Sequence, residues 1–240
     1  VYVIEKHGME MADKVIAVSY RTRDIINEKY GIPKDKIEVV YNAVDDNDRP
    51  VTQNFIQKII DRPTITFVGR ITLQKGPDYF LEAAKKVVEH ESEALFIMAG
   101  DGDMYHEMIE KAAHLGISGN VLFPGFVRGE EFERVYRASD LFVMPSVSEP
   151  FGLTALEALQ YGVPVLVSKQ TGAGESLNHC LKVDFWDVNE MAAKILSVIK
   201  YKPLRECLSD NGSEEVNKFS WDKSAGQCLS IYQRLTTYNS

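Results

Sequence analysis

Short apolar runs alternate with longer mixed segments along most of this chain. The runs are rich in Val, Ile, Leu and Phe, which is typical of strands buried in a parallel sheet. We expect strands at residues 14–19, 37–41, 64–68, 94–99, 121–124, 141–144 and 163–167, with a short last strand at 182–184.

The segments between these runs carry apolar residues at helical spacing. We expect helices at residues 21–30, 77–90, 104–115, 130–138, 151–161, 190–201, 203–209 and 220–235, with the end of another helix in 1–11 and partial helix in 55–60. Strands that alternate with helices predict an α/β fold, a doubly wound parallel sheet with right-handed crossovers.

A polar, turn-rich run at residues 42–50 interrupts the pattern and reads as a linker. We therefore place a domain boundary there and divide the chain into residues 1–49, 50–205 and 206–240. The first residue is Val rather than Met, so we expect the sequence to be part of a longer chain.

Composition narrows the function classes. The chain has 240 residues with 27 basic and 35 acidic side chains, a net charge of −8, which argues against a nucleic-acid-binding protein. No apolar run approaches the roughly 20 residues of a membrane span, and no signal peptide is visible. The three cysteines are widely spaced without a CxxC, so we expect no disulfide framework or zinc site and a reducing, cytoplasmic location.

Candidate chemistry gathers in the loops that follow the predicted strands. Parallel α/β sheets bind ligands at the carboxyl ends of their strands. The loop residues there are Gly69, Arg70, Lys75, Gly100, Asp101, Gly102, Gly125, Phe126, Val127, Arg128, Ser148, Glu149, Phe151, Gly152 and residues 171–175.

Arg70 and Lys75 flank one of these loops. Two cations beside a glycine-bounded backbone suit a diphosphate, although two solvated loop residues are the alternative. Gly100 and Gly102 resemble the opening of a dinucleotide fingerprint, but the third glycine is missing, and a tight turn without a ligand is the alternative.

The loop and helix at 149–161 carry two acids. Backbone N–H groups of Phe151, Gly152 and Leu153 lie at the expected helix start, where anions bind well. Glu149 alone could simply complement the helix dipole. Glu157 alone could lie on a solvated face, but its neighbours are apolar, so a buried carboxylate there needs a partner.

Together these segments resemble a known family. Glu149-Pro-Phe-Gly-Leu-Thr-Ala-Leu-Glu157 is similar to the E-x7-E motif of retaining glycosyltransferases of the GT-B fold, family 4 (group 1). Segments 12–19, 37–45, 67–76, 99–102, 121–126 and 138–146 resemble that family's other recurring segments in order and spacing. The resemblance covers residues 12 to about 200 and implies a Rossmann-like C-terminal donor-binding domain.

The resemblance implies a role for each candidate. Arg70 and Lys75 would contact the donor diphosphate, Glu149 the donor sugar, and Glu157 the ribose hydroxyls. The further donor-binding residues would be Gly69, Gly100, Gly102, Phe126, Val127, Phe151, Gly152 and Leu153. The implied donor is a UDP-, GDP- or ADP-sugar, with no metal or other cofactor and with retention of anomeric configuration.

The resemblance also implies an incomplete chain. Residues 1–49 would be the tail of an N-terminal acceptor domain and a linker, residues 50–205 the donor domain, and the helix in 206–240 would cross back onto the acceptor domain. The acceptor would be a carbohydrate or lipid-linked molecule, with a peripheral membrane contact through the N-terminal domain left open. A non-catalytic nucleotide-sugar-binding module, a glycogen-synthase-like glucan elongator and a nucleotide-sugar epimerase are the alternatives.

Overall fold

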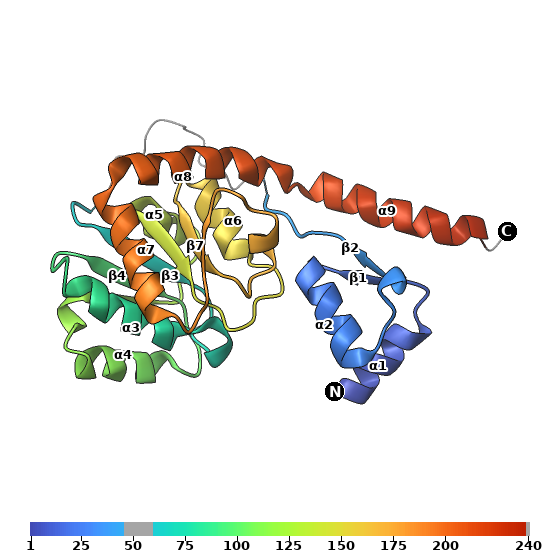
Figure 1. Cartoon of the computed structure of the whole chain (residues 1–240), viewed down its shortest axis with the longest axis horizontal. Coiled ribbons are helices and arrows are strands. Elements are labelled where there is room, and N and C mark those ends of the chain that lie inside the picture. Colours follow the sequence, from blue (N-terminus) through green and yellow to red (C-terminus); the bar gives the residue numbers. More distant parts are fainter. Residues whose placement is uncertain (46–59, 239–240) are drawn as a thin grey trace.

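The computed structural model describes residues 1–45 and 60–238. The linker's second half and the partial helix expected at 55–60 lie outside the described residues. A six-stranded parallel sheet is the largest element (Figure 1). Its strands are β3 (Thr64–Val68), β4 (Leu95–Ala99), β5 (Val121–Gly125), β6 (Leu141–Met144), β7 (Val165–Ser168) and β8 (Leu181–Val183). The predicted α/β fold is confirmed.

The strand order is β5-β4-β3-β6-β7-β8. From β3 the chain adds strands outward to β5, and from β6 it adds them in the opposite direction to β8. The order therefore reverses between β3 and β6, which lie side by side with Ile65 paired to Leu141. In open α/β sheets such a reversal marks the crevice in which ligands usually bind, which here is expected beyond the carboxyl ends of β3 and β6.

Helices cover both faces of the sheet. They are α3 (Pro77–Val88), α4 (Tyr105–His114), α5 (Glu130–Ala138), α6 (Leu153–Gln160), α7 (Val188–Lys200) and α8 (Lys202–Glu215). Alternate strand residues face opposite ways. Ile65 and Leu141 belong to the core shared with α3, α4 and α7, whereas Phe142 belongs to a second core shared with α6.

The first 45 residues form a small unit of their own. Its elements are α1 (Tyr2–Met11), β1 (Val15–Ala17), α2 (Tyr20–Tyr30) and β2 (Ile37–Val39), with β1 parallel to β2. Ser19 caps α2 by accepting a hydrogen bond from Thr22 N at 3.0 Å, and Gly31 ends it at φ 73°. Apolar side chains of this unit are exposed, with Val1, Val3, Ile4 and Met11 at 74–92%.

The last helix, α9 (Trp221–Tyr238), leaves the sheet and runs toward the first unit (Figure 1). Ser224 Oγ donates to Tyr41 O at 2.7 Å, and Arg234 Nη2 lies 3.0 Å from Glu38 Oε1. The helix α9 is therefore hydrogen-bonded to β2 and to the segment that follows β2. No helix among residues 1–45 and 60–238 has both the length and the apolar composition needed to cross a membrane.

Two predicted helix boundaries are wrong. The helix expected at 203–209 is longer and runs from Lys202 to Glu215. It continues because Gly212 packs against α6, where an added Cβ would lie 2.6 Å from Leu159 Cδ2. The helix expected from Phe151 begins at Leu153, since Gly152 takes φ 110° and ends the preceding loop.

The end of α8 is anchored by a buried carboxylate. Glu215 is 3% exposed and accepts hydrogen bonds at 2.9 Å from the backbone N–H groups of Asn178 and His179. Its other oxygen lies 3.1 Å from Lys218 Nζ. Burial raises the pKa of this carboxyl, but the two N–H groups and the ammonium outweigh it and lower the pKa to about 2 from 4.5.

We expect Glu215→Gln to lower the free energy of unfolding by up to about 3 kcal/mol at pH 7, because a depressed pKa stabilises the fold only where the carboxyl is ionised. The difference between the two proteins should be complete above pH 4.5 and shrink as the pH falls toward 2. Urea unfolding at pH 7 and at lower pH measures it. Glu214→Gln, at the exposed neighbouring position, is the control.

Candidate functional site

Two loops meet at the crevice where the strand order reverses. Residues 69–76 follow β3, and residues 145–152 follow β6. Val147 N donates to Gln74 O at 2.9 Å, and Gln74 Nε2 donates to Ser148 O at 2.9 Å. At Gly76 (φ 66°) an added Cβ would lie 2.2 Å from Pro145 O. The two loops are therefore held together before any ligand is considered.

The closest contact across the crevice joins two predicted site residues. Lys75 Nζ forms a hydrogen-bonded ion pair with Glu149 Oε2. Both side chains are largely buried, at 19% and 9% exposure. Burying a charge costs free energy unless the charge is paired. The ion pair offsets this cost for both Lys75 and Glu149.

Arg70 is the exposed cation of the same loop. Its Nη2 lies 3.4 Å from Gln74 Oε1, and Gln74 in turn holds the backbone of Ser148. Arg70 is exposed, so its guanidinium, with five N–H donors, is accessible to a ligand beside the loop after β3. Gln74 was missed by the sequence reasoning, because a polar loop residue carries no signal of its contacts.

The glycines of the site pack loops against one another. An added Cβ at Gly100 (φ 143°) would lie 1.8 Å from Gly69 O, and one at Gly102 would lie 2.2 Å from Ile71 O. The N–H of Gly100 donates to Gly125 O at 2.8 Å. Gly69 differs, because nothing lies within 4 Å of its added Cβ. Of the three, Gly69 is the one that leaves open space for a ligand.

Backbone hydrogen bonds fix the loop that carries Glu149. Glu149 N donates to Gln170 O at 3.1 Å, and Gly172 N donates to Glu149 O at 3.0 Å. Ala173 N donates to Phe151 O at 2.7 Å. These bonds fix the start of α6 next to the loop of Glu149. Of the first N–H groups of α6, which as a rule have no intrahelical partner, that of Ala155 donates to Gly152 O at 3.1 Å. The side chain of Phe151 is buried, so only its backbone could meet a ligand.

Glu157 is half-buried on α6 and meets a partner that the sequence did not reveal. Tyr136 on α5 donates to Thr154 O at 3.2 Å and lies 3.4 Å from Glu157 Oε2 through its hydroxyl. Burial raises the pKa of Tyr136 well above its ordinary value, and the neighbouring Glu157 raises it further. The phenol therefore stays protonated and orients the carboxylate.

Residues of the first unit border the site. Ser19 Oγ donates to Pro150 O at 2.8 Å. Glu175 accepts from the backbone N–H groups of Tyr20 at 2.6 Å and Arg21 at 3.0 Å, at the start of α2. Tyr41 packs on Phe151 with ring centroids 5.8 Å apart. Sequence separations of 110 or more residues hid these contacts.

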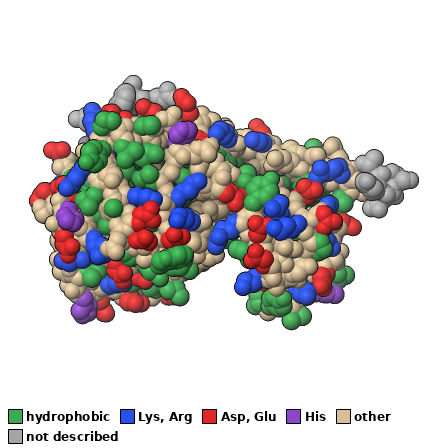
Figure 2. Space-filling model, viewed as in Figure 1, with side chains coloured by type: hydrophobic (Ala, Val, Ile, Leu, Met, Phe, Trp, Pro, Cys, Tyr) green, Lys and Arg blue, Asp and Glu red, His purple; other side chains and the backbone are tan. Residues whose placement is uncertain are grey.

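Two of the predicted donor-binding residues, Phe126 and Val127, directly follow β5. Phe126 is 71% exposed, whereas Val127 is partly buried against the core beneath α5. In the described parts of the chain no group of three His, Cys, Asp or Glu side chains is arranged to hold a metal ion. Figure 2 shows positive and negative side chains interspersed on one face, and a hollow between the sheet domain and the α1–α2 unit.

Comparison with known proteins identifies the family. Residues 48–215 match the family "Glycosyl transferases group 1", and residues 2–48 match "Glycosyltransferase Family 4". The chain belongs to the group 1 glycosyltransferases. This confirms the family resemblance seen in the E-x7-E segment and in the other matching segments of the sequence.

Related glycosyltransferases are longer than this chain. An uncharacterized glycosyltransferase of Methanocaldococcus jannaschii is 32% identical over 95% of this chain and 63% of its own length. Mannosylfructose-phosphate synthase of Agrobacterium fabrum is 29% identical over 93% of this chain and 53% of its own. The crystal structure of Anabaena HepE with UDP and glucose superposes with a TM-score of 0.84 at 21% identity, covering 98% of this chain and 66% of that one. The chain thus spans between half and two thirds of these relatives.

We expect Gly102→Ala to destabilise the domain by about 2 kcal/mol or more, because the added methyl meets backbone rather than a flexible side chain. Thermal or urea unfolding measures the loss. Gly119→Ala is the matched control, since nothing lies within 4 Å of its Cβ position. Equal effects at the two glycines would contradict the packing role of Gly102.

Proposed function

We propose that this chain binds a nucleotide-diphosphate sugar in the crevice between β3 and β6 and forms the donor half of a retaining glycosyltransferase. The observation that supports the proposal is the meeting of Arg70, Lys75 and Glu149 at the start of α6, where the strand order reverses. Family membership supplies the reaction class, transfer of a sugar from a nucleotide-sugar donor.

The charges suit a diphosphate. Arg70 offers a fork of donors at the mouth, Lys75 a point charge deeper in, and the first turn of α6 unpaired N–H groups. These donors offset the negative charge that develops as the diphosphate leaves. We propose that Glu149 holds Lys75 toward the phosphates and accepts hydrogen bonds from hydroxyls of the donor sugar.

The nucleoside would lie on the β4–β5 side of the crevice. The Glu157 carboxylate, oriented by Tyr136, would accept two ribose hydroxyls. Gly69 leaves open space where β3 ends, and the exposed Phe126 with Val127 would border the base. Gly100 and Gly102 would shape this side through loop packing.

We propose that the acceptor half of the site comes from sequence outside these 240 residues, because the chain spans 63% and 53% of the length of two of its relatives. We propose a carbohydrate or lipid-linked acceptor, held mainly by an N-terminal domain of which residues 1–45 are the tail. HepE, a structural neighbour, was crystallised with UDP and with UDP-glucose, which supports a UDP-sugar donor without excluding GDP or ADP. All three cysteines are free, and we propose a reducing, cytoplasmic setting.

Arg70→Ala should weaken binding of a nucleoside diphosphate by about 1–3 kcal/mol, the value of a charge-assisted hydrogen bond. Isothermal titration with UDP, GDP and ADP measures the affinity and identifies the base. Lys75→Ala should weaken nucleoside diphosphate binding as much. It should also lower the free energy of unfolding, because the Glu149 carboxylate is then left buried without its ion-pair partner. Arg134→Ala, an exposed arginine of α5, is the control. Unchanged affinity in both variants would refute the assignment.

The isolated chain should bind the donor weakly and transfer little or no sugar, since the acceptor half of the site is missing. Adding an N-terminal domain should restore sugar transfer. In that complete protein, Glu149→Gln should reduce the transfer rate by orders of magnitude. The far-ultraviolet circular dichroism of the variant should stay unchanged. Turnover by the isolated chain, or full activity of Glu149→Gln, would contradict this. Donor binding without transfer in the complete protein would favour a non-catalytic binding module.

A further inference from the structure

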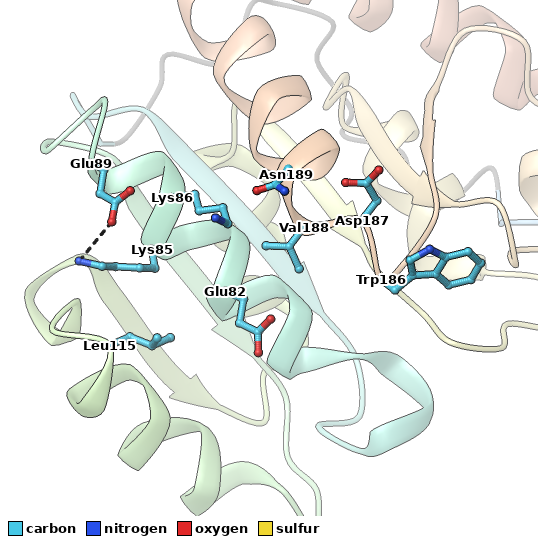
Figure 3. Close-up of a pocket in the computed structure, with 9 residues that line it drawn as sticks. All are labelled: Glu82, Lys85, Lys86, Glu89, Leu115, Trp186, Asp187, Val188 and Asn189. Carbon is cyan, nitrogen blue, oxygen red and sulfur yellow. Dashed lines mark ion pairs between the residues drawn. The ribbon is translucent and has the colours of Figure 1, made fainter.

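A pocket lies outside the proposed donor site, between α3 and the start of α7 (Figure 3). Its volume is about 520 Å³, within the range of about 300–1,000 Å³ that is usual for small-molecule sites. Glu82 and Lys86 line it from α3, and Asn189 lines it from α7. Asp187, the N-cap residue of α7, stands at its border, and its carboxylate accepts a hydrogen bond from Glu190 N at 2.9 Å. Nothing in the proposed donor binding uses these side chains.

The pocket has no excess of cations, because its lining carries three carboxylates (Glu82, Glu89 and Asp187) and two ammonium groups (Lys85 and Lys86). Lys85 pairs with Glu89 at 3.6 Å, and Lys111 pairs with Glu82 at 2.7 Å. A phosphate or nucleic acid requires an excess of cations, which the pocket does not have. An apolar peptide would bury these charged side chains without offering them hydrogen-bond partners, which costs free energy. Carboxylates, an amide and an ammonium at close quarters instead offer both donors and acceptors, which suits a neutral ligand rich in hydroxyl groups.

Trp186 forms one end of the pocket. Figure 3 shows its indole turned outward beyond Asp187, and it is 57% exposed. The ring is held in place by Phe185, edge to face at 4.8 Å and 85°, and Phe185 rests on Tyr79 at 5.2 Å. An exposed, rigid indole presents an electron-rich face, against which the partly positive C–H groups of a sugar ring pack.

The Trp186 platform is linked to the proposed donor loop through neighbouring side chains. Tyr79 Cδ2 lies 3.2 Å from the Cβ position of Gly76, the residue after Lys75. Trp186 therefore follows β8 at the same edge of the sheet at which Lys75 follows β3. A chain of sugar rings that starts near the donor crevice could continue along this edge.

We propose that the pocket binds a neutral oligosaccharide, with one ring stacked on Trp186 and the next hydrogen-bonded to Asn189, Glu82 and Lys86. This inference rests on the proposed function, because it assigns the pocket to the acceptor or product glycan of the same reaction. A second contact on the glycan raises its effective concentration at the transfer site without a new catalytic group.

The chain holds only two tryptophans, Trp186 and Trp221, which makes the test direct. Trp221→Phe leaves Trp186 as the sole indole reporter. Trp186→Phe leaves Trp221, which is 50% exposed on α9 and outside the pocket, as the matched control. Each variant is titrated with maltopentaose, cellopentaose and mannopentaose while indole emission is recorded.

At least one of the three sugars should change the emission of the Trp221→Phe protein in a saturable manner and leave the Trp186→Phe protein unchanged. Adding Asn189→Ala to the Trp221→Phe protein should raise the half-saturating concentration about tenfold, the loss of one or two hydrogen bonds. No saturable change with any of the sugars, or the same change in both proteins, would overturn the inference. So would a stronger response of Trp186 to UDP.

Titration calorimetry with UDP separates this inference from the proposed function. Trp186→Phe should bind UDP as the unmodified chain does. Glycan binding at Trp186 without any UDP binding would contradict the proposed donor site but not the glycan pocket. UDP binding without a glycan response would contradict the glycan pocket but not the donor site.

Discussion

The buried ion pair between Lys75 and Glu149 is the constraint on which the site depends. Each charge comes from a loop that follows a different strand, and neither could be buried alone at an acceptable cost in free energy. Removing one partner of such a pair typically costs about 3–5 kcal/mol, because the other is left uncompensated. The pair thus ties the end of β3 to the end of β6 and fixes the crevice between them.

Close backbone approach is the second requirement at the crevice. The loops after β3, β4 and β6 pass within van der Waals distance of one another, and side chains at Gly76, Gly100 or Gly102 would collide with backbone carbonyls. These glycines therefore explain why the loops can be short and rigid. A rigid loop loses little conformational entropy on binding, which is how a preorganised site gains affinity.

Long-range contacts attach the first 45 residues to the site. The carboxylate of Glu175 accepts two N–H groups at the start of α2, and Ser19 donates to Pro150 in the loop of Glu149. The same loop therefore joins the crevice between β3 and β6 to the first unit. In the proposed function, an N-terminal domain attached through that unit would sit against this loop, on the side from which an acceptor would approach.

The sequence by itself determined the α/β class, the strand positions to within a few residues and the identities of Arg70, Lys75, Glu149 and Glu157 as candidates, since apolar periodicity and loop chemistry are local properties. The tertiary structure alone decided which side chains meet, such as Lys75 with Glu149 and Tyr136 with Glu157. It also decided that α8 continues to Glu215. These depend on strand order and on packing between segments far apart in the chain, which no local pattern encodes.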